Sequence, residues 1–132
     1  MALDVSMFLA SKAVPVKGTT YVVSDRFVDA EGKPIPWVLR PVPSAKDKEL
    51  KQACTNNGHF DNGKYAEMLT AESVVEPNLA DATLQDSYHV YGKTELLEQM
   101  LYAGEMNKLQ LKALAINGMA TPLDDIVGEA KN

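Results

Sequence analysis

The sequence predicts an α+β fold in which an N-terminal β-hairpin, at about residues 20–42, packs on a mainly α-helical body of four to six short helices. β-branched and aromatic residues are concentrated in the hairpin region. The stretch 62–118 carries most of the large apolar residues at helical spacing, in segments separated by helix-breaking residues. With 132 residues, the chain has the size of one domain. We expect an arm at residues 1–18, a single α+β domain at residues 19–118 and a weakly structured tail at residues 119–132.

The arm begins with a helix signal. Asp4 is a suitable N-cap for two or three helical turns that would place Val5, Phe8 and Leu9 on one face, and Pro15 ends the segment. So short a helix is marginal on its own. Two interpretations remain open: the helix packs on its own domain, or the arm is exposed and Phe8 and Leu9 dock into another protein.

The hairpin has β-rich segments on both sides of a polar turn. The segments are 21–23 and 27–28, the turn is 29–33, and the return strand is 35–42. Because Pro36 and Pro41 lack a backbone donor, we expect the return strand to lie at a sheet edge or to bend away from the sheet. A lone hairpin is only marginally stable, so it must rest on the helices through Phe27 and Trp37. The sequence therefore predicts a largely buried Trp37 and no more than four strands.

Four helix starts are predicted from capping residues. They are Ser44 (with Asp47 at capping-box spacing), Asp61 or Asn62, Asp81, and Thr94. The helix after Asp61 is expected to run close to Pro77 and to turn Val75 inward, and the polar loop 58–63 is expected to be mobile. Leu84, Tyr88 and Tyr91 are spaced to share one helical face.

Charge and cysteine content exclude several functions. Thirteen basic and eighteen acidic residues give a net charge of −5, which opposes binding to nucleic acid. The longest apolar runs are shorter than the ~20 residues that cross a bilayer, so no membrane association is expected. Cys54 is the only cysteine, so an internal disulfide is impossible and a cytoplasmic location fits.

Catalytic and metal-binding patterns are weak. Cys54, His59 and His89 are the candidate soft ligands, but their spacing matches no structural zinc site. Cys54 near His59 resembles a nucleophile–base pair, although a cysteine on an apolar helix face is more commonly a packing residue. We therefore expect no catalytic residue, no metal and no cofactor.

Several residue runs, in a defined order, link the chain to a known family. The most specific is 73–88 (Ser-Val-Val-Glu-Pro-Asn-Leu-Ala-Asp-Ala-Thr-Leu-Gln-Asp-Ser-Tyr), and the others are Val23–Phe27, Glu31–Trp37, Arg40, Asp61, Lys64-Tyr65, Leu96-Leu97, Met100-Leu101, Gly104-Glu105 and Ile116–Gly118. In these runs the chain resembles the XkdN-like tail assembly chaperones of long-tailed phages and defective prophages. It departs from the family at 89–91, where His-Val-Tyr stands in place of a smaller, glycine-containing turn.

The resemblance implies a non-enzymatic role. It implies binding to the tape measure protein, a long helical polypeptide that sets tail length, together with keeping that protein soluble and recruiting tail tube subunits. It also implies action in the cytoplasm of the bacterial host and absence from the mature virion. Our candidate partner-binding residues are Phe8 and Leu9 on the arm and Tyr88, Tyr91 and Met100 on the body.

Two other functions are weighed against this one. A structural tail or head–tail adaptor component would form rings, and a small enzyme would depend on Cys54 or His59. Genes of tail assembly chaperones often also produce a longer protein by ribosomal frameshifting near the stop codon. The codons of Ala130-Lys131-Asn132 can spell the slippery heptamer A-AAA-AAC, so a frameshifted longer form of the chain is a further predicted partner. The alternative is that Lys131-Asn132 is simply a soluble ending.

Overall fold

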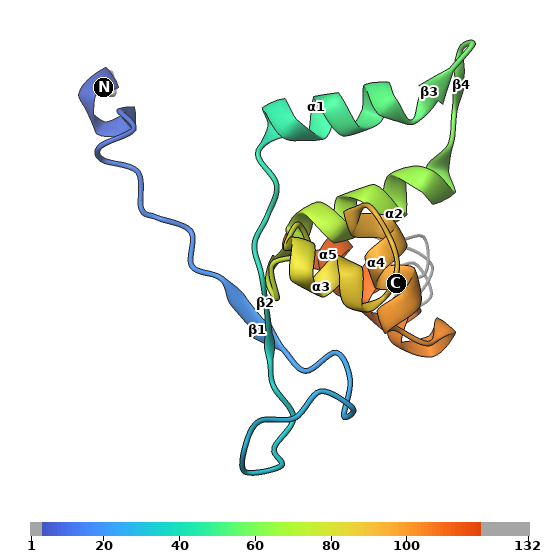
Figure 1. Cartoon of the computed structure of the whole chain (residues 1–132). Coiled ribbons are helices and arrows are strands. Elements are labelled where there is room, and N and C mark those ends of the chain that lie inside the picture. The colour runs from blue at the N-terminus through green and yellow to red at the C-terminus, as the bar shows by residue number, and fades with distance from the viewer. Residues whose placement is uncertain (1–3, 120–132) are drawn as a thin grey trace, which may run out of the picture.

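The structure, a computed structural model, describes residues 4–119. The fold is α+β, as predicted, and combines five α-helices with two small antiparallel sheets (Figure 1). The helices are α1 (Ser44–Ala53), α2 (Asn62–Ser73), α3 (Ala82–Ser87), α4 (Lys93–Met100) and α5 (Ala103–Ile116), and a 3₁₀ turn η1 spans Val5–Phe8. The strands are β1 (Thr19–Tyr21), β2 (Trp37–Leu39), β3 (Thr55–Asn56), β4 (His59–Phe60) and β5 (Val74–Glu76). The predicted division into arm, domain and tail stays a prediction, and the tail from residue 120 lies outside the described residues.

β2 is the central strand of the larger sheet, whose order is β1-β2-β5. Both neighbours run antiparallel to it, with Thr19 opposite Leu39 on one side and Val74 opposite Leu39 on the other. The prediction of an edge position was therefore wrong. Pro36 and Pro41 do flank the strand, but both lie outside its three paired residues, so neither removes a ladder donor.

β5 occupies residues that the sequence analysis assigned to a helix. α2 ends at Ser73, and the next three residues extend and pair with β2, so that Val75 is 40% exposed rather than turned inward. The backbone N–H of Arg40 donates to the Ser73 carbonyl at 2.8 Å and continues the pairing. Two successive β-branched valines followed by a residue that precedes proline were the available signal for a strand.

The segment 55–60, which overlaps the predicted loop, forms a tight hairpin. β3 and β4 pair through Thr55–Phe60 and Asn56–His59, and Asn57 and Gly58 form the turn with φ angles of 53° and 79°. Asn-Gly is the preferred sequence for such a turn, because both positions need positive φ. Residues 4–119 therefore contain five short strands, one more than the predicted maximum.

Two of the four predicted helix caps are found. The side chain of Asp61 accepts from the Lys64 amide at 3.0 Å, and that of Asp81 accepts from the Leu84 amide at 2.8 Å. The two other helices begin one residue or more earlier than predicted, with Pro43 and Gly92 at the N-cap and no side-chain cap. Ser44 and Thr94 accordingly lie inside the helices.

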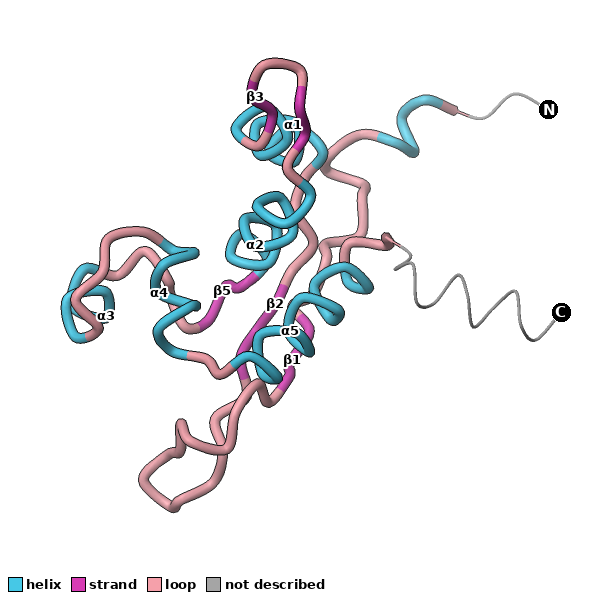
Figure 2. Tube along the Cα trace, turned by 90° about the vertical axis from the view of Figure 1, so that its right-hand side faces the viewer, coloured by secondary structure: helices cyan, strands magenta, loops and turns pink. Residues whose placement is uncertain are grey.

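The hydrophobic core lies where α2, α4 and α5 meet β2 and β5 (Figure 2). Trp37 is 2% exposed, which confirms its predicted burial. Leu39 belongs to the same cluster, together with residues from the three helices: Ala71, Leu96, Leu97 and Leu109. In the described part of the chain, no helix is long and apolar enough to cross a membrane.

The arm extends away from the body (Figure 1). Asp4 caps η1 by accepting from the Ser6 amide at 2.9 Å, but η1 is a single 3₁₀ turn rather than the predicted two or three helical turns. None of its residues is buried. Without a surface to pack on, a segment this short gains too little to continue as an α-helix.

Candidate functional site

A largely apolar cleft of about 530 Å³ lies between the β1–β2 loop and α3. Its apolar lining consists of Phe27, Ile35, Pro36, Trp37, Pro77, Leu84, Tyr88 and Met100, and its polar lining of Glu76 and Ser87. We call this the apolar cleft. Its volume is within the ~300–1,000 Å³ typical of binding pockets.

One wall of the apolar cleft is the loop that joins β1 to β2. The loop folds back on itself, with the Ile35 amide donating to the Phe27 carbonyl at 2.8 Å. The rings of Phe27 and Trp37 are tilted by 46° with centroids 6.3 Å apart, a favourable aromatic arrangement. The loop therefore presents Ile35, which is 43% exposed, at the open side of the cleft.

Arg26 attaches this loop to the helical body. Its Nη2 donates to the Met100 carbonyl at 2.7 Å and to Oε1 of Glu105 at 2.8 Å. The guanidinium also lies over two rings, 5.1 Å from the centroid of Phe27 and 4.8 Å from that of Tyr102. These contacts hold the loop wall against the junction of α4 and α5.

Glu105 is stabilised as a carboxylate at this junction. Hydrogen bonds from Ser24, from the Tyr102 amide and from Arg26 outweigh desolvation and lower the pKa of Glu105 to about 2. The hydrogen bond that the Tyr102 amide donates to Oε1 of Glu105, at 2.9 Å, also caps the start of α5. Glu105 is therefore ionised whenever the protein is folded near neutral pH.

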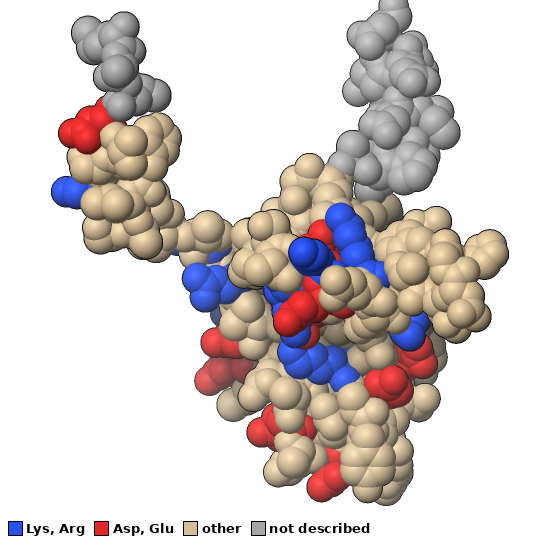
Figure 3. Space-filling model, turned by 90° about the horizontal axis from the view of Figure 1, so that it is seen from above, with Lys and Arg blue, Asp and Glu red and all other residues tan. Residues whose placement is uncertain are grey.

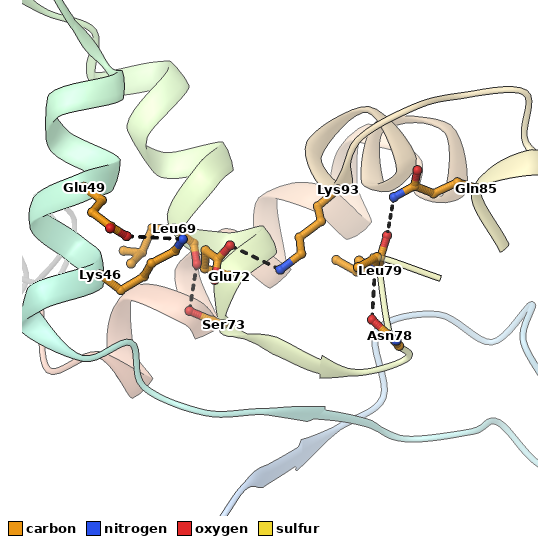
Figure 4. Close-up of polar contacts among 10 residues, drawn as sticks. Lys46, Glu49, Leu69, Glu72, Ser73, Asn78, Leu79, Gln85 and Lys93 are labelled. Atoms are coloured by element: carbon orange, nitrogen blue, oxygen red, sulfur yellow. Dashed lines mark hydrogen bonds and ion pairs between the residues drawn. The ribbon is translucent and has the colours of Figure 1, made fainter. Parts of the chain in front are cut away.

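The opposite wall is α3, which is held by Gln85 (Figure 4). Its Nε2 donates to the Leu79 carbonyl at 2.7 Å, and its Oε1 accepts from the Gly92 amide at 3.1 Å. Leu79 itself is 1% exposed, so the turn before α3 is fixed from inside the core. Asn78 closes that turn by accepting from the Ala80 amide at 3.0 Å.

The structure brings together only some of the predicted partner-binding residues. Tyr88 and Met100 line the apolar cleft, with Met100 4% exposed. Tyr91 is 88% exposed and lies outside the cleft, because α3 ends at Ser87 and the chain turns at His89, whose φ is 59°. The predicted stripe from Leu84 through Tyr88 to Tyr91 is therefore broken after Tyr88.

Phe8 and Leu9 are exposed on the arm, by 69% and 51%, and do not line the cleft. The sequence analysis did not select Ile35 or Leu84 as site residues. Leu84 stands one helical turn before Tyr88, which was a usable signal. Ile35 carried no such signal, because its place on the loop wall depends on contacts with residues distant in the sequence.

A second groove, between α2 and α4, has a different character. It measures about 430 Å³ and combines Leu50 and Met68 with several carboxylates and lysines. Lys93 of α4 pairs with Glu72 of α2 at 3.2 Å, as Figure 4 shows. Burial and the nearby Glu98 raise the pKa of Glu67 in this groove. Apolar partners suit the apolar cleft better than this groove.

The charged side chains on the visible face in Figure 3 are intermixed in sign. Lys and Arg alternate there with Asp and Glu. Oppositely charged side chains also pair along α1, as in Lys46–Glu49 and Lys51–Asp47. This face has no extended basic surface of the kind that binds a phosphate backbone.

Cys54 and His59 do not form a nucleophile–base pair in the described residues. Cys54 is 3% exposed, its Sγ lies 3.5 Å from the Met68 sulfur, and burial raises the pKa of its thiol. A raised pKa disfavours the reactive thiolate. His59 is exposed in β4. No group of residues within 4–119 has the composition of a metal site.

The chain has relatives of matching length in Bacillus subtilis (strain 168). It is 27% identical over 139 residues to "Phage-like element PBSX protein XkdN", covering 98% of this chain and 94% of that protein. It is 25% identical to "Uncharacterized protein YqbN", covering 98% and 93%. The crystal structure of YqbN has the same fold, with a TM-score of 0.83 at 24% identity over 91% of this chain and 100% of that one.

A family model described as "Phage XkdN-like tail assembly chaperone protein, TAC" matches residues 5–131. That description names an assembly chaperone rather than an enzyme, in agreement with the predicted non-catalytic role. The match spans nearly the whole chain and confirms the resemblance drawn from the residue runs above. The chain belongs to the phage XkdN-like tail assembly chaperone family.

Proposed function

We propose that this chain binds the tape measure protein during tail assembly, keeps it soluble and helps to recruit tail tube subunits. The proposal places this work in the cytoplasm of the bacterial host, before the virion is complete. The observation that carries it is an open apolar cleft, in a family of tail assembly chaperones, together with an exposed apolar arm.

The chemistry of the cleft suits a helical, apolar partner. A tape measure protein is expected to present long apolar helical faces, and such faces bind in hydrophobic grooves through residues at i, i+3, i+4 and i+7. Aromatic and methionine side chains at Phe27, Tyr88 and Met100 give a groove that can re-pack around different sequences. Covering such faces prevents the aggregation that exposed apolar patches cause.

The proposed contact residues fall into two groups. Tyr88 and Met100 contact the partner inside the apolar cleft, while Phe8 and Leu9 add a second contact from the arm. Tyr91 is proposed as a contact at the exposed end of the α3–α4 connection. Two separate contacts joined by one chain bind more tightly than either alone, because the second contact forms at a high effective concentration.

The test is co-expression of this chain with the tape measure protein of the same phage. Wild type is compared with Ile35→Ser in the cleft and with Phe8→Ser/Leu9→Ser on the arm. The control is Leu111→Ser on α5, because Leu111 is 44% exposed and Ile35 is 43% exposed, while Leu111 lies outside the cleft. Thermal melts of the purified variants confirm that each one is folded.

We expect wild type and the Leu111→Ser control to keep the tape measure protein in the soluble fraction and to co-purify with it. Each test variant should weaken binding by about tenfold or more, since a large apolar side chain contributes ~1.5–3 kcal/mol when buried. Equal binding by all four proteins would refute the proposed surface. Absence of tail tube protein from the wild-type complex would refute the recruitment step alone.

We also propose that the gene produces a frameshifted longer form of this chain, which acts as a further partner. The residues that would carry it, Ala130 to Asn132, lie outside the described part of the chain. Antibody to this domain should detect a second, heavier protein in lysates that express the native operon.

A further inference from the structure

We propose that the arm of one copy of this chain binds in the apolar cleft of a second copy. The proposal concerns self-association of the purified chain, and it uses the same arm and cleft as the tape measure proposal. It rests on two apolar features of the described residues, the exposed arm and the apolar cleft, which belong to the same chain and carry opposite charges.

The arm presents side chains that match a groove-binding pattern. Val5, Met7, Phe8 and Leu9 are exposed by 77%, 65%, 69% and 51%. Val5, Phe8 and Leu9 stand at i, i+3 and i+4, the spacing with which an amphipathic helix fills a hydrophobic groove. An isolated segment of this length is only marginally helical, so binding in the cleft would supply the surface that orders it.

The geometry favours the cleft of another copy over the chain's own cleft. β1 enters the sheet with Thr19 opposite Leu39 and ends with Tyr21 opposite Trp37. The arm therefore leaves at the Leu39 end of β2, while the cleft lies at its Trp37 end. Figure 1 shows the arm and the β1–β2 loop leaving the sheet in opposite directions.

Arg40 fixes the direction in which the arm leaves. Its Nη2 donates to the Val16 carbonyl at 2.9 Å, next to the start of β1. To reach its own cleft, the arm would have to break this contact and turn back along the sheet. A second copy can offer its cleft without that reversal, as in an exchange of identical segments between protomers.

Charge supports the same pairing. Residues 1–18 hold two lysines and one aspartate, so the arm is net positive, whereas the whole chain has a net charge of −5. Glu76 lines the cleft, and Lys12 follows Phe8 by one helical turn. Opposite charges on the arm and the cleft favour their encounter and disfavour pairing of two clefts.

Self-association would hide both apolar features of the free protein. The occupied cleft would open only when another helix displaced the arm. A purified chain should therefore pair in a concentration-dependent manner that depends on the arm of one copy and the cleft of the other.

Two variants make the pairing testable by complementation. Phe8→Ser/Leu9→Ser damages the arm and keeps the cleft, while Ile35→Ser damages the cleft and keeps the arm. Sedimentation of wild type over a range of concentrations should show monomers associating, and each variant alone should stay monomeric. Mixing the two variants should restore a complex that contains one copy of each. Leu111→Ser serves as the matched control and should associate like wild type.

Trp37 reports occupancy of the cleft directly, because it lines the cleft and is the only tryptophan in the chain. Titrating a synthetic peptide of residues 4–17 into Phe8→Ser/Leu9→Ser should give a saturable change in Trp37 fluorescence. The same peptide should bind at least about tenfold more weakly to a protein that combines these changes with Ile35→Ser.

Three results would overturn the proposal. Wild type could remain monomeric at all concentrations while the peptide leaves Trp37 unchanged. Association could persist in both variants, which would place the contact elsewhere. The Trp37 signal could depend on the arm but not on protein concentration, which would show that the arm occupies the chain's own cleft. Melting curves of each variant establish that a lost signal is not unfolding.

Discussion

Arg26 and Glu105 form an ion pair across 79 residues of sequence, with Nη2 of Arg26 2.8 Å from Oε1 of Glu105. The pair joins the loop that forms one wall of the apolar cleft to the first turn of α5. Arg26 also donates to the Met100 carbonyl, so the same side chain positions a residue of the cleft. The stability of the pair and the shape of the cleft are therefore linked.

Glu105→Gln should destabilise the protein near neutral pH and have less effect in acid. The pKa of Glu105 is about 2 in the folded protein, below the ~4.3 of an unfolded glutamate. A lowered folded pKa gives stability that is present above the unfolded pKa and is lost as the pH falls toward the folded one. Urea unfolding at about pH 7 should show a loss on the order of 1–2 kcal/mol.

The same measurement between about pH 4.3 and pH 2 should show that difference shrinking, because the wild-type carboxylate takes up its proton in that range. A difference that is constant down to about pH 2 would show that Glu105 acts through packing rather than through its charge. Glu31→Gln, at an exposed position, is a suitable control for the general effect of removing one acidic group.

Asn117→Ala should destabilise the fold by about 1–3 kcal/mol. The Asn117 side chain accepts from the Val42 amide at 2.7 Å and donates to Ser73 Oγ at 2.9 Å, joining three separate segments at the end of α5. Its removal leaves the Val42 amide without this acceptor. Chemical denaturation measures the loss, and Asn107→Ala on the exposed face of α5 should cost little. Equal losses of stability in the two variants would contradict the proposed role of the Asn117 hydrogen bonds.

Local signals in the sequence predicted part of the local structure. Asp61 and Asp81 cap helices as predicted, because a carboxylate at an N-cap satisfies amides of its own first turn. Ser44 and Thr94 could also accept from first-turn amides, but neither residue is an N-cap in the structure. At those sites Pro43 and Gly92 already set the backbone angles at which the helix starts.

Features that depend on distant residues were predicted less well. Val74 and Val75 extend the helix pattern of α2, yet they pair as a strand because β2 offers its free edge there. The cleft was missed for the same reason. Phe27, Leu84 and Met100 come from three separate elements, and only tertiary packing brings them together. Membership of the family was the exception, since it rests on the order of residue runs rather than on contacts.

Cys54 should behave as a packing residue. In the folded protein its thiol is buried and its pKa is raised, so a thiol reagent should modify it only as fast as the surrounding structure opens. Denaturant should release normal reactivity. A Cys54→Ser/His59→Ala variant should support normal tail assembly. Loss of assembly by a variant with an unchanged melting curve would support the hypothesis of an enzyme that depends on Cys54 or His59.

Phe8→Ser/Leu9→Ser should leave thermal stability almost unchanged. Both side chains are more than half exposed, so replacing them removes little buried apolar area. Exposed substitutions of this kind change the free energy of unfolding by within about 0.5 kcal/mol. As a comparison, Leu96→Ala in the core, where Leu96 is fully buried, should cost about 2–5 kcal/mol.

The comparison decides between the two interpretations of the arm, provided that the melts are recorded at low protein concentration, where self-association is weak. If the arm variant melts with wild type while Leu96→Ala melts much lower, Phe8 and Leu9 are free to contact another chain, and weakened binding by the variant reports on the interface alone. If the arm variant loses stability on the scale of Leu96→Ala, the arm packs on its own body and both proposals that use it fail. In the first case, raising the protein concentration should stabilise wild type but not the arm variant, because only wild type gains from pairing.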